Sequence, residues 1–295
     1  MIYLHENGVT VVATDEAKRG KVYELNGEKY YVARGVSDIK GIVDSGEYPL
    51  NRVITSKLTS LNYLFQIRGG YSNKAVPDNF SDDISNWDTS NVLSMEEVFS
   101  GWPEFNQDIS NWDTSKVEQM SGMFKSSKYQ GSYYMGPTSF NQDISSWDVS
   151  NVENMSEMFL GATSFNQDIS NWDVSNVTQM KGLFQEATSF NQDLRSWKLN
   201  EKLPKSRTMF KDAQAFNIKE YNPFLNKIAK ERKVDTSTAG LSTDDKKTFS
   251  KIKKLLTERD YDKIDLGLEL LISLNNSELF ETLLFDCKIN TNDYD

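Results

Sequence analysis

Apolar and polar positions recur along the middle of the chain with a period of 25 residues. A leading Phe stands at positions 80, 105, 140, 165, 190 and 216, so successive copies are 25, 35, 25, 25 and 26 residues apart. The four best copies read FSDDISNWDTSNVLSMEEVF (80–99), FNQDISNWDTSKVEQMSGMF (105–124), FNQDISSWDVSNVENMSEMF (140–159) and FNQDISNWDVSNVTQMKGLF (165–184). A partial copy, ITSKLTSLNYLF (54–65), precedes them. Such self-similarity predicts stacked repeats, because one unit cannot bury its own apolar face.

Each unit is predicted to hold one short extended segment and one short helix. In the fourth copy the extended segment covers residues 169–174. Val177, Met180 and Phe184 then follow at i, i+3 and i+7, which is the spacing of one helix face. A strand–helix unit of this length lies in the range of leucine-rich repeats. The sequence therefore predicts an α/β solenoid, a right-handed coil of ~25-residue strand–helix repeats.

The N-terminal part is predicted to be a small β module that covers one end of the solenoid. Three strands are expected at Val9–Thr14, Lys21–Leu25 and Lys29–Ala33, and Asn26-Gly27 is typical of a two-residue hairpin turn. A short helix is expected at Asp38–Ser45.

The C-terminal part is predicted to be helical. Apolar residues have helical spacing in residues 222–233, 244–258, 262–274 and 277–284, and a polar linker (234–241) separates the first two segments. The sequence thus divides into an N-terminal β-hairpin module (1–50), a repeat solenoid (51–217) and a helical C-terminal region (218–295).

Trp and Asp also recur at fixed places in the repeat. The Trp row could be an exposed platform for sugars or bases, but the same spacing places it inside the coil, and we favour core packing. The Asp residues could accept hydrogen bonds from turn amides or bind calcium, and we favour the amides. An Asn row is expected to satisfy backbone groups at a turn. The rows are Trp87, Trp112, Trp147, Trp172, Trp197; Asp83, Asp108, Asp143, Asp168, Asp193; Asp88, Asp113, Asp148, Asp173; and Asn106, Asn141, Asn166, Asn191.

Composition narrows the possible chemistry. The chain has one histidine, His5, and one cysteine, Cys287, whereas common zinc sites need several such ligands and a nucleophile–histidine enzyme would depend on His5 alone. We therefore expect no catalysis, no cofactor and no metal. The net charge is −10, and residues 80–198 hold 17 acidic against 6 basic side chains, which disfavours nucleic acid as a partner.

The first residues of the chain and its hydropathy indicate where in the cell the protein is expected. The first residues, MIYLHENGVTVVATDEAKRGK, lack the basic start and apolar run of a signal peptide, and no stretch of 18 apolar residues is present. A cytoplasmic protein without a membrane span is therefore expected.

The repeat motif FNQDISNWDTSNV, followed by MF, resembles the BspA-type leucine-rich-repeat region, also described as the bacterial surface protein 26-residue repeat. The leader ENGVTVVATDEAKRGKVYELNGEKYYVARG resembles the hairpin module that often precedes this array in bacteria. The resemblance covers roughly residues 6–217 and implies a curved, non-catalytic solenoid used in adhesion or protein binding. It also implies a cell-surface or extracellular location as an alternative.

Two insertions interrupt the repeat at the same phase. They are QIRGGYSNKAVPDN (66–79) and KSSKYQGSYYMGPTS (125–139), and equal phase predicts one solenoid edge, with the two about 10–15 Å apart. Tyr among Ser and Gly is typical of adaptable binding loops. The candidate binding residues are Arg68, Tyr71, Tyr129, Tyr133, Tyr134 and Met135.

We therefore expect a non-catalytic scaffold for protein–protein recognition whose partner binds this edge. Two alternatives remain open. The chain could be a structural or accessory subunit of a larger assembly, or a surface adhesin that binds carbohydrate.

Overall fold

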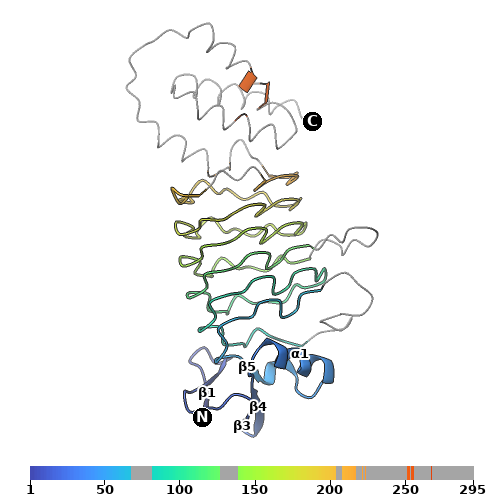
Figure 1. Ribbon diagram of the computed structural model, residues 1–295, viewed down its shortest axis with the longest axis vertical. Coiled ribbons are helices and arrows are strands. Elements are labelled where there is room, and N and C mark those ends of the chain that lie inside the picture. Colours follow the sequence, from blue (N-terminus) through green and yellow to red (C-terminus); the bar gives the residue numbers. More distant parts are fainter. Residues whose placement is uncertain are drawn as a thin grey trace.

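A computed structural model describes residues 1–67, 82–126, 139–203 and 208–216, together with the single residues 221, 223, 251, 252, 254, 255 and 267. A small N-terminal β module with one helix lies at one end of a stack of flattened coils (Figure 1). We number the coils by their leading Phe: coil 1 from 80, coil 2 from 105, coil 3 from 140, coil 4 from 165 and coil 5 from 190. Residues 54–67 form a partial coil before coil 1.

The N-terminal module contains two small sheets. In one, β1 (Ile2–Leu4) pairs antiparallel with β2 (Val11–Ala13). In the other, β4 (Glu28–Val32) lies between β3 (Val22–Leu25), its antiparallel neighbour, and β5 (Val53–Ile54), its parallel neighbour. The module has its own buried cluster of Val11, Ala13, Ala17, Tyr30, Val32 and Ile54.

The three strands predicted for this module are confirmed as β2, β3 and β4. Asn26 and Gly27 both have positive φ, 54° and 80°, which a two-residue type I′ hairpin turn requires. The sequence pattern missed β1, because three residues are too few to show an alternating pattern and β1 depends on pairing with β2.

The predicted short helix is confirmed as α1 (Val36–Ser45), which begins two residues earlier than expected. It ends at Gly46, whose φ of 65° is the left-handed conformation that glycine adopts at helix ends. Ile39 and Ile42 on its buried face belong to the core cluster of the solenoid. The 3-10 turn η1 (Leu50–Arg52) then leads into β5.

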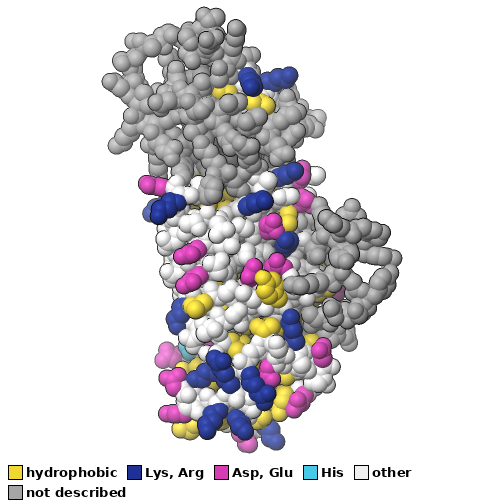
Figure 2. All heavy atoms as spheres, in the orientation of Figure 1, with side chains coloured by type: hydrophobic (Ala, Val, Ile, Leu, Met, Phe, Trp, Pro, Cys, Tyr) yellow, Lys and Arg dark blue, Asp and Glu magenta, His cyan; other side chains and the backbone are white. Residues whose placement is uncertain are grey.

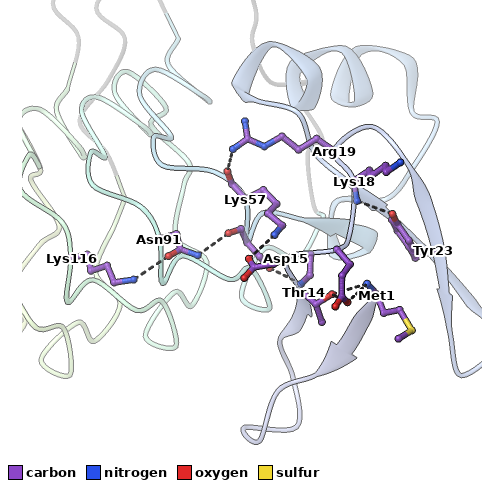
Figure 3. Close-up of polar contacts among 12 residues, drawn as sticks. Met1, Thr14, Asp15, Lys18, Arg19, Tyr23, Lys57, Asn91 and Lys116 are labelled. Carbon is purple, nitrogen blue, oxygen red and sulfur yellow. Dashed lines mark hydrogen bonds and ion pairs between the residues drawn. The ribbon is translucent and has the colours of Figure 1, made fainter.

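Polar contacts fasten the module to the first coils (Figure 3). The Ala13 amide donates to Ser56 Oγ at 3.0 Å, and Lys57 Nζ lies 3.3 Å from Asp15 Oδ1. The Arg19 guanidinium donates to the Lys57 carbonyl. Asn91 Nδ2 continues this series by donating to the Ser56 carbonyl at 3.0 Å. The module is therefore joined to the partial coil by backbone as well as side-chain contacts.

The helix predicted in each repeat is wrong. Between residues 51 and 216, the described residues form no α-helix. In coil 3, the amides of Met155 and Phe159 donate to the Gln179 and Leu183 carbonyls of coil 4, at 2.8 and 2.9 Å. An α-helix would direct these amides to carbonyls four residues back in their own coil. Positive φ at Glu157, 58°, also interrupts any helix there.

The predicted extended segment is also displaced. Residues 169–174 form a turn, in which the Trp172 amide donates to the Ile169 carbonyl at 3.1 Å. Strand-like parallel bridges instead link Ser94, Gln119, Asn154 and Gln179 of successive coils, inside the segment predicted as helix. Each coil is therefore a series of tight turns, and inter-coil bonds take the place of helical ones.

Aromatic rings form the long core of the stack, as the repeat predicts. The Phe124 ring lies 3.9 Å from Phe140 and 5.6 Å from Phe159 between centroids. Trp147 is 3 % exposed, and its Nε1 donates to the Ile109 carbonyl at 3.1 Å. Trp112, Trp172 and Trp197 make the same donation to the preceding coil, and Trp87 donates to the Leu50 carbonyl in η1. The exposed-platform interpretation of the Trp row is therefore wrong.

The predicted Asn row is confirmed as a turn-satisfying ladder. The amide of Asn141 donates to Asn106 Oδ1 at 2.9 Å, and the amide of Asn166 donates to Asn141 Oδ1 at 2.8 Å. Asn191 repeats this contact with Asn166. Each side chain thus serves the backbone of the next coil.

The predicted C-terminal helices lie almost wholly outside the described residues. Residues 221, 223, 251, 252, 254, 255 and 267 are helical. Ile252 is fully buried and belongs to the core cluster of the coils, and the Leu194 amide donates to the Tyr221 carbonyl at 3.2 Å. The described part of this region thus packs on the last coils.

Candidate interaction surface

The two insertions leave the solenoid from one edge. The Ile67 amide donates to the Ser100 carbonyl at 2.8 Å, and the next residue of that coil, Gly101, donates to the Lys125 carbonyl at 2.7 Å. Ser126 in turn donates to the Leu160 carbonyl at 2.7 Å. Ile67 and Ser126, the last described residues at the start of each insertion, therefore lie two coils apart in one hydrogen-bonded row, as the repeat phase predicts.

The six candidate binding residues lie outside the described residues. They are Arg68, Tyr71, Tyr129, Tyr133, Tyr134 and Met135. The structure describes the points at which their segments leave the frame.

The edge beside these exits carries paired polar side chains. Lys125 Nζ lies 2.6 Å from Glu157 Oε2 in the next coil, and Gln66 donates to the Glu97 carboxylate. Glycine alternates with glutamate in this row. At Gly122, whose φ is 60°, a Cβ would lie 2.8 Å from Glu97 Cγ. The Glu97 side chain thus occupies the space beside the glycine that a Cβ would fill. Side chains therefore pack closely along this edge.

Trp102 is the aromatic residue at this edge that sequence reasoning missed. It stands where later coils have Ala162 and Ala187. Its ring lies 5.8 Å from the Phe65 ring and 5.0 Å from the Phe105 ring, and it is 8 % exposed. The sequence does contain a signal for Trp102, because the largest residue type stands at a repeat position where later coils have alanine. Trp102 gives the edge a rigid aromatic base between the two exits.

The Asp rows accept hydrogen bonds from turn amides, as predicted. Asp143 Oδ1 accepts from the Ser145 amide at 2.9 Å, and this backbone bond lowers the pKa of Asp143. The pKa of Asp173 is lowered mainly by the Ser175 side chain and also by its amide. The other members of both rows make the same contact. These side chains hold the turns by accepting backbone hydrogen bonds.

Two further features are absent from the described part of the chain. No group of three or more His, Cys, Asp or Glu side chains in these ranges is arranged to hold a metal ion. No described helix is long and apolar enough to span a bilayer. On the face in Figure 2, Lys and Arg gather over the N-terminal module, whereas backbone and uncharged polar side chains together make up most of the visible coil surface.

Comparison with known proteins connects the repeats to a family. Neither curated proteins nor solved structures include a match to the chain. Residues 45–134 and 131–223 each match the family described as "Mycoplasma protein of unknown function, DUF285". The two copies span residues 45–223, more than half of the 295 residues, and cover the partial coil and the aromatic stack. The chain therefore belongs to the DUF285 family.

Proposed function

We propose that this chain is a non-catalytic repeat scaffold for protein–protein recognition, and that the partner binds the edge from which the two insertions leave. The observation that carries the proposal is the row joining Ile67, Ser100, Gly101, Lys125 and Ser126, which places both exits on one edge. Binding residues are often carried by loops that a rigid scaffold positions.

Rigidity of the frame supports this role. Around the exits, alternate amides bond to the neighbouring coil at 2.7–3.0 Å, and the Phe rings stack behind them. A frame held in this way loses little freedom when a partner binds, so more of the contact energy remains as affinity.

The finer fold assignment is part of the proposal. The motif FNQDISNWDTSNV supports a BspA-type relative of leucine-rich repeats, coiled in the right-handed sense, with both ends capped. The described contacts of α1 and Ile252 with the core are consistent with such caps.

Shortening the second insertion tests the proposal. Residues 126–138 would be replaced by Gly-Ala-Thr, the residues at 161–163 in the next coil, so that coil 2 closes as coil 3 does. The variant should keep the parent melting temperature, because the bond from the Ser126 amide to the Leu160 carbonyl has a counterpart in coil 3, where the Gly161 amide donates to the Gln185 carbonyl at 2.7 Å. Binding to the partner, isolated with the full chain from the native host, should weaken about tenfold, or about 1.4 kcal/mol.

Three outcomes would contradict this proposal or favour one of its alternatives. Equal binding of the partner by the folded short variant and the parent would show that the edge is wrong. Self-association at rising concentration would instead favour an assembly subunit, and selective binding on a glycan array would favour an adhesin. Matched replacement of exposed Val22 by Ser, on the N-terminal module, should leave partner binding unchanged.

A further inference from the structure

A furrow of ≈ 450 Å³ runs across coils 1 to 4, away from the insertion edge. In coil 2, Glu118 on the furrow precedes Ser126 at the edge by eight residues, and between them the amides of Met120, Gly122 and Phe124 bond to coil 3. The furrow is lined by Leu93, Lys116, Glu118, Asn151, Glu153 and Asn176.

One row of the furrow differs from the rows that hold the fold. The Phe, Trp, Asp and Asn rows each repeat one residue type and one internal contact. The furrow row instead reads Leu93, Glu118, Glu153 and Thr178 along coils 1 to 4. Leu93 is 42 % exposed, and outside the N-terminal module it is the only large hydrophobic residue exposed among the described residues. Side-chain identity in this row is therefore not required by packing.

The two glutamates of this row are like-charged neighbours. The Glu153 amide donates to the Glu118 carbonyl at 2.8 Å, so the two residues are adjacent on successive coils, about 5 Å apart. Neither carboxylate forms a hydrogen bond or ion pair within the described residues. Lys116 makes no described ion pair with them, and its Nζ donates to Asn91 Oδ1 at 3.0 Å, toward coil 1 (Figure 3). Like charges in such register repel, and a cation between them would relieve this.

We propose that the furrow binds an extended segment of a partner protein in which an apolar residue is followed, two positions later, by Arg or Lys. The apolar residue covers Leu93, and the cation lies between Glu118 and Glu153. Spacing supports this pairing. The midpoint of the glutamates is one and a half coils from Leu93, about 7 Å, and an extended chain advances about 6.6 Å in two residues. Asn151 and Asn176 donate through Nδ2 to backbone carbonyls, which leaves Oδ1 as an acceptor for the bound backbone.

Peptide binding to the full chain tests the proposal by fluorescence anisotropy. The probe is fluorescein-labelled Gly-Ser-Leu-Ser-Arg-Ser-Gly-amide. It is compared with a peptide that has Gln for Arg and with one in which Leu and Arg are adjacent. The probe should bind the parent, and both altered peptides should bind about fivefold or more weakly. Glu118→Gln/Glu153→Gln and Leu93→Thr should each weaken probe binding by a similar factor.

Matched variants separate the furrow from general charge attraction. Glu24→Gln/Glu104→Gln removes two exposed carboxylates elsewhere and should bind the probe as the parent does. The variant with the shortened second insertion should also bind it normally, so this result is independent of the insertion edge. Absence of probe binding to the parent, or equal loss in the Glu24/Glu104 variant, would overturn the proposal. A melting temperature several degrees lower in Glu118→Gln/Glu153→Gln would also overturn it, because the glutamates would then serve the fold.

Discussion

Replacing Trp147 by Ala tests how the aromatic stack stabilises the solenoid. The Trp147 side chain is 3 % exposed, lies 6.3 Å from the Phe124 ring and donates to the Ile109 carbonyl at 3.1 Å. Truncation leaves a cavity beside Phe124, and such changes cost about 3–5 kcal/mol. It also removes one of the two hydrogen bonds that the Ile109 carbonyl accepts, the other coming from the Trp112 amide at 3.1 Å, and losing one such bond costs about 1 kcal/mol. We expect the free energy of unfolding to fall by about 4 kcal/mol.

Urea unfolding followed by far-ultraviolet circular dichroism measures this loss. Trp147→Phe is the matched control, since it keeps an aromatic ring but removes the indole N–H, and its loss should be about half as large. A loss below about 1.5 kcal/mol for Trp147→Ala would refute a packed, hydrogen-bonded Trp row, because it would match removal of a partly exposed side chain.

Three further outcomes follow from the turns. The melting temperature measured with EDTA should equal that without it, because the Asp carboxylates are satisfied by amides; a drop of ten degrees or more would contradict this. Asp143, Asp173 and Asp193 have lowered pKa values, so their stabilisation is complete above an unfolded pKa of about 3.9 and is lost as pH falls through the lower folded values. The urea concentration at the unfolding midpoint should therefore decrease when the pH is lowered below about 4. This decrease should be smaller in the Asp173→Ala variant. Gly122→Ala should destabilise by about 1 kcal/mol or more because of its positive φ and the 2.8 Å approach to Glu97, whereas Gly41→Ala in α1 should be neutral or stabilising by thermal melting.

Burial in the coils could be predicted from the period alone. Trp112, Phe124 and Phe159 recur in phase with their counterparts, and a row that repeats in a stack must face the same surroundings in every coil. The amide contacts of the Asp and Asn rows follow from the same reasoning, because the short side chains recur beside turns. The position of the insertion exits also follows from phase. The partner-binding role of the insertions remains a prediction.

The surface features required the structure. Trp102 departs from an Ala row, and Glu118 and Glu153 form a like-charged pair in a variable row, but both signals gain meaning only from their neighbours. The repeat period predicts that Glu118 and Glu153 lie one coil apart, but it does not predict which side chains lie between them. The position of Lys116, directed toward Asn91, is a tertiary fact.

By itself, the sequence determined the repeat, its core rows, the hairpin at Asn26-Gly27 and the helix near Asp38–Ser45. Only the tertiary structure decided the local conformation of each coil. Apolar residues at i, i+3 and i+7, such as Val177, Met180 and Phe184, fit a helix and a series of turns equally well. The choice depends on where the backbone amides find acceptors, and in this stack the neighbouring coil supplies them.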